Sequence, residues 1–287
     1  MSFEVPSVSP ATQPGSADSS TAALLARYRW HALRRSLSNF ALLRHRHCAG
    51  FLASMHQSGT HWLKFMLANA LAARHGLPPP QYNHANDFIG GPRDPHVHAQ
   101  LPHLISSHSI PHPLMCVAPL HRQLRLPPYV ILVRDLRASL VSNYEKWRDR
   151  YGVTFPEYLR GDPGGRRYNS DLWWCLRFLN GWGVFAARTP ATTLVVRYED
   201  MQADPGAVLA RVGVFLALDL GAAHVAAAVA ASTKERMRAR HDPGRPQGEI
   251  RADRRDLAHW FGPAEERFVR DVCPRLLRYR YGYDYER

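Results

Sequence analysis

Residues 48–76 have the sequence CAGFLASMHQSGTHWLKFMLANALAARHG, in which a strand, a turn and a helix follow one another directly. The apolar run at residues 48–55 is too short for a helix, so it predicts a buried strand. The turn Ser58-Gly59-Thr60 follows, and apolar residues then recur at helical spacing until Gly76. A tight turn before a helix start offers backbone amides to an anion. The same pattern is also compatible with an ordinary helix cap.

Three further segments extend this order of elements. Residues 103–109 (HLISSHS) predict a second strand, and residues 128–135 (PYVILVRD) are the clearest buried strand. Residues 192–200 (TTLVVRYED) repeat that strand pattern, and helical patterns follow both of these strands. Strands that alternate with helices indicate a parallel sheet covered on both faces. We therefore predict an α/β fold, a three-layer sandwich with a central parallel sheet and a P-loop-like phosphate-binding loop.

The composition is that of a globular protein. Of the 287 residues, 45% are hydrophobic and 21% are charged, which argues against a disordered or fibrous chain. No apolar run is long enough to cross a membrane, and the first residues lack the pattern of a secretory signal, so we predict a cytoplasmic location. The four cysteines are widely spaced without a CxxC pair, which predicts reduced thiols rather than disulfides or a zinc site.

The charge balance predicts an anionic ligand. Lysine and arginine total 37 against 24 acidic residues, which gives a formal net charge of +13. All but three of these cations are arginines, whose planar fork suits phosphate or sulfate. An arginine bias of the whole genome would give the same composition. Charge alone leaves nucleic acid, anionic lipid and nucleotide open as partners.

We predict three regions along the chain. Residues 1–20 are small and polar, which predicts a flexible N-terminal tail. Residues 21–47 form a basic amphipathic helical segment, which either packs on the edge of the domain or makes peripheral contact with a membrane surface. Residues 48–287 form the main domain.

A second strand–helix junction carries anion-binding residues. In VRDLRASLVSNY, Arg134 ends the best strand and Ser142 lies about two turns into the next helix. A guanidinium and a hydroxyl in these places can grip one terminal phosphate from two sides. A P-loop kinase is an alternative, but GxxxxGK[ST] is absent and no metal-holding carboxylate is evident.

Together, these segments resemble the PAPS-dependent sulfotransferase family, over residues 48–283. The family binds the 5′-phosphosulfate of PAPS (3′-phosphoadenosine 5′-phosphosulfate) with a strand and a PKSGTTW-like loop. The resemblance places that role on His56, Gln57, Ser58, Gly59, Thr60, His61 and Trp62. The family's second signature, R-x7-S after an apolar strand, matches Arg134 and Ser142 and implies that they bind the 3′-phosphate.

The resemblance implies further roles. His108, in ISSHSIP, matches the family's general base, and Tyr198, in RYEDM, is expected near the adenine. Trp62 is a second candidate for adenine contact. The remaining cofactor-binding residues implied by the resemblance are Ser232, Thr233, Arg245, Gln247 and Gly248.

One departure concerns catalysis. The family's loop lysine, which bridges the donor phosphate and the sulfuryl group, is Gln57 here. Positioned cations supply much of the rate in such transfers, so the loss of one can cost on the order of a hundredfold. His56, His61, Arg245 and Arg251 are candidates to deliver the missing charge, and Lys64 is a poorer one. A non-catalytic relative that binds PAPS or its product is therefore the alternative.

We predict a sulfotransferase in which His108 and Gln57 serve the transfer from PAPS to a hydroxyl or amine. The acceptor is a carbohydrate, a glycolipid or a small metabolite, and irregular residues 82–102 and 151–168 are expected to shape its pocket. No nucleic acid partner is expected. Histidines are frequent between residues 81 and 122, but we predict no metal because neither HExxH nor a nearby cysteine or carboxylate pair accompanies them. The sequence does not indicate the oligomeric state.

Overall fold

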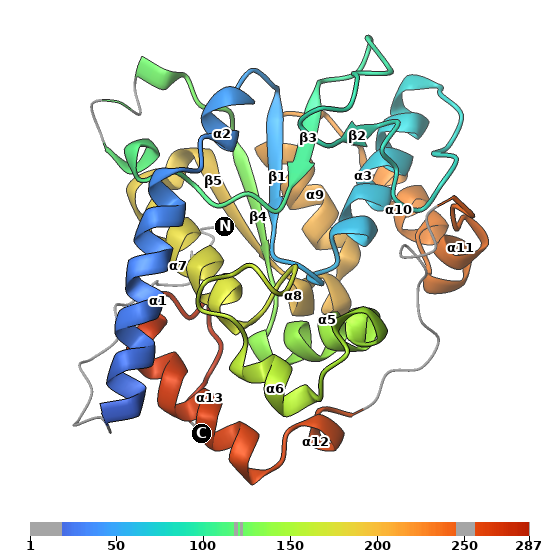
Figure 1. Cartoon of the computed structure of the whole chain (residues 1–287). Coiled ribbons are helices and arrows are strands. Elements are labelled where there is room, and N and C mark those ends of the chain that lie inside the picture. Colours follow the sequence, from blue (N-terminus) through green and yellow to red (C-terminus); the bar gives the residue numbers. More distant parts are fainter. Residues whose placement is uncertain (1–18, 118–119, 121–122, 245–255, 287) are drawn as a thin grey trace.

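The computed structural model describes residues 19–117, 120, 123–244 and 256–286. Within these ranges the strands form one parallel sheet with the order β2-β3-β1-β4-β5 (Figure 1). The strands are β1 (Gly50–Ser54), β2 (Ile89–Gly90), β3 (Leu104–Ser107), β4 (Tyr129–Val133) and β5 (Thr193–Arg197). The predicted parallel α/β sheet is confirmed.

Helices cover both faces of the sheet. One apolar cluster receives side chains from α1 (Ser19–Leu37), α2 (Ala41–Arg44), the 3₁₀ helix η1 (Pro113–Cys116), α5 (Leu136–Tyr151), α6 (Phe155–Arg160), α7 (Leu172–Arg188), α12 (Leu257–Trp260) and α13 (Pro263–Leu276). The other receives them from α3 (Thr60–His75), α8 (Tyr198–Ala203), α9 (Pro205–Phe215), α10 (Ala222–Ala231) and α11 (Lys234–Ala239). The short 3₁₀ helix η2 (Pro190–Thr192) leads into β5.

Alternation along the central strands produces these two clusters. In β4, Tyr129, Ile131 and Val133 belong to the first cluster, whereas Val130 and Leu132 belong to the second. Successive side chains of a strand point to opposite faces, so a strand that is apolar throughout must be covered on both sides. The predicted three-layer sandwich follows from this pattern.

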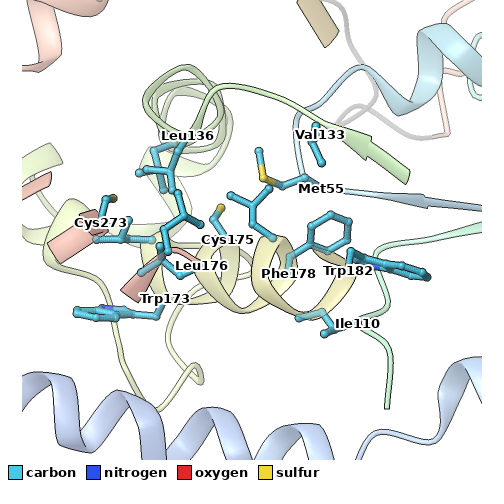
Figure 2. Close-up of a cluster of buried hydrophobic side chains, with 14 of the residues drawn as sticks. Met55, Ile110, Val133, Leu136, Trp173, Cys175, Leu176, Phe178, Trp182 and Cys273 are labelled. Atoms are coloured by element: carbon cyan, nitrogen blue, oxygen red, sulfur yellow. The ribbon is translucent and has the colours of Figure 1, made fainter. Parts of the chain in front are cut away.

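Helix α7 supplies much of the first cluster. Figure 2 shows Trp173, Leu176, Phe178 and Trp182 along this helix, with Met55 and other side chains from the strand ends packed over it. Trp173 and Trp182 are almost fully buried, so both belong to the core between α7 and the sheet. All four cysteines are free thiols.

The N-terminal helix α1 lies along the periphery of the molecule (Figure 1). Tyr28 contacts Trp173 of α7 with ring centroids 5.3 Å apart, and Arg35 Nη1 donates to the carbonyl of Gly165 at 2.8 Å. The division of the chain at residues 20 and 47 stays a prediction, and residues 1–18 of the predicted tail lie outside the described residues.

Three local predictions were wrong. Strand β5 ends at Arg197, and Tyr198 begins α8, because Glu199 and Asp200 fall in a first helical turn, where the helix dipole favours acidic side chains. The segment 82–102 contains β2, which pairs with β3 at the sheet edge. The segment 151–168 contains α6, which the reciprocal hydrogen bonds of Thr154 and Glu157 cap.

The strand register brings the carboxyl ends together. Ala53 of β1 lies opposite Ser107 of β3, and Ser54 lies opposite Leu132 of β4. Strand β1 is central, and the chain proceeds first to one side of it and then to the other. This makes the end of β1 a topological switch point, where open α/β sheets bind ligands.

Candidate active site

A cavity of about 720 Å³ lies at this switch point. Its volume is within the range of small-molecule sites, roughly 300–1,000 Å³. Most residues predicted for the site line it: Gln57, Gly59, Thr60, His61, Trp62, His108, Arg134, Ser142, Tyr198, Ser232 and Thr233. The structure therefore brings together residues that the sequence spreads over more than half of the chain.

The loop between β1 and α3 has a backbone that only glycine fits. Gly59 has φ of 89°, and a Cβ there would lie 2.7 Å from Cδ2 of Tyr198. Helix α3 begins at the next residue, so Gly59 is its N-cap residue. Gly59 therefore caps α3 without a side-chain hydrogen bond, and the first turn of α3 borders the cavity.

Ser58 is the one described member of the predicted loop set that does not line the cavity. Its side chain is fully buried, and Oγ donates to the carbonyl of Met55 at 2.6 Å, so it holds the turn together. Thr60 Oγ1 donates to Ser54 Oγ at 2.9 Å, which ties the start of α3 to the end of β1.

Arg134 and Ser142 meet at Gln57. Arg134 Nη1 donates to the Gln57 carbonyl at 2.6 Å, and its guanidinium lies over the ring of Tyr198, 4.1 Å from the centroid. Ser142 Oγ donates to Gln57 Oε1 at 3.5 Å. Gln57 has φ of 61°, and these contacts hold the loop in that left-handed conformation. The two residues of the R-x7-S signature are therefore adjacent to the loop in space.

Aromatic side chains frame another part of the cavity. Trp62 lies edge-on to Tyr198 with ring centroids 6.2 Å apart, and Trp62 Nε1 donates to the carbonyl of Ser232 at 3.1 Å. Ser232 is buried, and its Oγ has no hydrogen-bond partner among the described residues. A buried hydroxyl without a partner favours a ligand that supplies one.

His108 follows the carboxyl end of β3 and opens on the cavity. Its Nδ1 lies 2.8 Å from the Ser54 carbonyl and 3.3 Å from Ser54 Oγ. A carbonyl only accepts, so Nδ1 carries the proton and Nε2 keeps the lone pair. Loss of solvation beside the neighbouring side chains lowers the pKa of His108 below 6.5. The hydrogen bond to the Ser54 carbonyl raises that pKa, whereas the positive charges of Lys64 and Lys146 lower it further. The ring is therefore neutral at pH 7.

His56 stacks on His108, with ring centroids 3.8 Å apart, and Trp174 lies edge-on to His56 at 4.5 Å. Burial lowers the pKa of His56 well below 6.5, and repulsion between the two protonated rings of His56 and His108 and the positive charge of Lys146 lower it further. Partial loss of solvation at the cavity wall, followed by the positive charges of Lys64 and Lys146, also lowers the pKa of His61, although its side chain stays exposed. Both rings are neutral at pH 7 in the ligand-free protein.

Sequence reasoning missed part of the lining. Lys146 could have been found, because it lies one helical turn after Ser142 and therefore on the same face of α5. The others lie beside predicted site residues or in the segment before α7, at positions where the sequence carries no signal of its own. The missed residues are Glu145, Lys146, Trp147, Asn169, Gln202, Lys234 and Met237.

Part of the predicted site cannot be placed. Arg245, Gln247, Gly248 and the candidate cation Arg251 lie outside the described residues. Within the described ranges, no group of three or more histidine, cysteine, aspartate or glutamate side chains is arranged to hold a metal ion. In the same ranges, no helix has the length and apolar character needed to cross a membrane.

Known proteins share this fold. A family model for the sulfotransferase domain matches residues 50–244. The mouse sulfotransferase SULT7A1, solved with PAP (3′-phosphoadenosine 5′-phosphate), is 17% identical, with 84% of this chain and 88% of that chain covered and a TM-score of 0.55. A retinol dehydratase solved with androsterone and PAP is 15% identical, with 83% and 85% covered and a TM-score of 0.51. No curated protein matches by sequence.

Proposed function

Because this chain belongs to the sulfotransferase domain family, we propose that it transfers the sulfuryl group of PAPS to an acceptor hydroxyl or amine. The observation that carries the proposal is that a neutral His108 opens on the same cavity as the Arg134–Gln57–Ser142 cluster. His108 offers a proton acceptor in this cavity, and the Arg134–Gln57–Ser142 cluster offers a place for an anion.

The lining fits an adenine nucleotide with two phosphate-bearing ends. Arg134 and Ser142 would hold the 3′-phosphate by a charged fork and a hydroxyl. The amides of the first turn of α3, with Gly59, would hold the 5′ end, because a helix start favours negative charge. Trp62 and Tyr198 offer aromatic faces for the base, and the unpartnered Ser232 hydroxyl lies beside them.

His108 has the protonation state that a general base needs. Nε2 holds the lone pair, and the low pKa keeps it unprotonated at neutral pH. PAPS, when bound, supplies the sulfuryl group and departs as PAP. The acceptor oxygen or nitrogen bonds to sulfur as its proton passes to Nε2, and His56 and the Ser54 carbonyl keep the ring oriented.

Nucleotide binding tests the proposal. We expect calorimetric titration to give micromolar affinity for PAP and weaker binding of AMP and ATP, because only PAP has the 3′-phosphate that Arg134 and Ser142 would grip. Equal affinities for all three, or none, would contradict the proposed site.

The alternative is a relative that binds PAPS without transfer, for which Gln57 in place of the loop lysine is the reason. Selective PAP binding without turnover on a panel of sugars, glycolipids, alcohols, phenols and amines would favour it. The acceptor class stays open among carbohydrates, glycolipids and small metabolites, and no metal is part of the proposal.

We further propose that α1 makes peripheral contact with an anionic membrane surface. Trp30, Leu33 and Leu37 lie on one face of α1 and are 65%, 55% and 51% exposed. The arginines Arg27 and Arg34 are also exposed on this helix. Large apolar side chains with arginines beside them are typical of helices that lie on anionic lipid.

Vesicle sedimentation tests this contact. The protein is expected to sediment with vesicles of phosphatidylcholine and phosphatidylglycerol, but not with phosphatidylcholine alone, and salt is expected to weaken the binding. Changing Trp30, Leu33 and Leu37 together to serine should abolish it. Val214→Ser is the matched control, because Val214 of α9 is 83% exposed. Equal sedimentation of the triple variant would contradict the proposal.

A further inference from the structure

The charge that Gln57 does not supply must come from another residue if the chain is a catalyst. Sulfuryl transfer spreads negative charge over the transferred group and builds it on the leaving phosphate, so a positioned cation lowers the barrier. His56 and His61 border the cavity, but both are neutral at pH 7 because their pKa values are lowered. Neither histidine supplies the charge in this state.

Three cationic side chains line the cavity within the described residues. Arg134 contacts the Gln57 carbonyl and the Tyr198 ring, where it serves the nucleotide. Lys234 begins α11 directly after Thr233, beside the Trp62–Ser232 contact. Lys146 comes from α5. Arg134 and Lys234 therefore lie beside the proposed 3′-phosphate and adenine sites, and Lys146 is the remaining cation of the three.

Lys146 lines the cavity, and its Nζ lies 5.5 Å from the centroid of the Trp147 ring. It follows Ser142 by one helical turn, so both side chains project from the same face of α5. Ser142 Oγ is 3.5 Å from Gln57 Oε1, which puts this face beside the substituted loop position. The Lys146 charge also lowers the pKa of His56, His61 and His108, which agrees with an ammonium group near the base.

Lys64 is the other cation near these histidines. Its side chain is buried, and Nζ donates to Asn86 Oδ1 at 2.7 Å. It is not among the cavity-lining residues. We therefore separate Lys64, which stabilises the packing between α3 and the segment before β2, from Lys146, which faces the cavity.

The use of lysine in this chain is selective. Only three of its 37 basic residues are lysines, and two of them, Lys146 and Lys234, line this cavity. An ammonium group is a compact point charge on a flexible stem, whereas a guanidinium is a planar fork.

We propose that Lys146 supplies, from helix α5, the positive charge that Gln57 does not provide to the transferring sulfuryl group. This inference rests on the proposed function. The sulfur–oxygen bond to the nucleotide phosphate breaks as the bond to the acceptor forms, and the ammonium group keeps its protons and stabilises the negative charge throughout.

The first experiment is calorimetric titration with PAPS. Lys146→Met should weaken PAPS binding about tenfold, because a charge-assisted contact is lost. Adding Gln57→Lys to that variant should restore affinity to within about threefold of the wild type, because the charge returns at the loop. Arg148→Met is the matched control, since Arg148 is exposed on the same helix and does not line the cavity; it should leave the affinity unchanged.

The second experiment does not depend on nucleotide or activity. In a proton NMR titration of the ligand-free protein, Lys146→Met should raise the pKa of His108, because a repelling positive charge is removed. Arg148→Met should not.

The outcomes separate the two proposals. Unchanged PAPS affinity in Lys146→Met, an equal loss in Arg148→Met, or no rescue by Gln57→Lys would overturn the role of Lys146. A wild-type protein that binds neither PAPS nor PAP would instead overturn the proposed function, and the inference would fall with it. An unchanged His108 pKa in Lys146→Met would by itself overturn the placement of the ammonium group near the base.

Discussion

His108→Asn is expected to lower kcat by about 10²–10⁴-fold while leaving the affinity for PAP unchanged. The asparagine amide can donate to the Ser54 carbonyl as His108 Nδ1 does, so the local hydrogen bond survives and only the base is lost. The measurement is steady-state turnover of PAPS with an acceptor found by screening, alongside calorimetric titration of PAP.

His103→Asn is the matched control for this variant. His103 directly precedes β3, stacks on His96 with ring centroids 4.6 Å apart, and does not line the cavity. It should leave turnover unchanged. A His108→Asn enzyme with wild-type kcat would show that His108 is not the base.

The pH dependence of turnover gives a second test of His108. The pKa of His108 is lowered, so the wild-type rate should be constant near pH 7 and fall only as the pH drops through a value below 6.5, where the ring gains a proton. The residual rate of His108→Asn should lack this acidic limb. A wild-type rate that falls already between pH 8 and pH 7 would contradict a neutral His108.

The central strands and the residues that follow them could be predicted from the sequence. A run such as YVILV has one interpretation in a chain of alternating strands and helices, and it fixes the place of Arg134 at the carboxyl edge. Parallel strands then bring His108 and the loop after β1 to the same edge. The proximity of these side chains can therefore be predicted from the parallel strands alone, before any of their contacts is known.

Other parts of the site depend on contacts that the sequence does not encode locally. Ser58 belongs to the loop motif, but its hydroxyl points away from the cavity and donates to the Met55 carbonyl. This local hydrogen bond from side chain to backbone stabilises the tight turn. His56 was predicted as part of the phosphate-binding loop, but the sequence does not indicate that its ring stacks on His108 and contacts Trp174. The strand at the sheet edge, β2, has two residues, too few for a periodic pattern.

Arg134→Ala is expected to weaken PAP binding about a hundredfold and to abolish the preference for PAP over AMP. The buried guanidinium is the charged member of the predicted 3′-phosphate site, and a bidentate contact of this kind accounts for about 2–3 kcal/mol. The measurement is calorimetric titration of both nucleotides against the wild type and the variant.

The affinity of Arg134→Ala for AMP shows whether the variant has lost only the 3′-phosphate contact or has also lost the structure of the loop. Arg134 also holds the loop through the Gln57 carbonyl, so a collapsed loop would lower the affinity for both nucleotides, whereas loss of the 3′-phosphate contact lowers only that for PAP. Arg134→Lys keeps the charge without the fork and should fall between the wild type and Arg134→Ala. If Arg134→Ala keeps the preference for PAP, the 3′-phosphate lies elsewhere, and the agreement between the R-x7-S signature and the cavity would then reflect the fold alone.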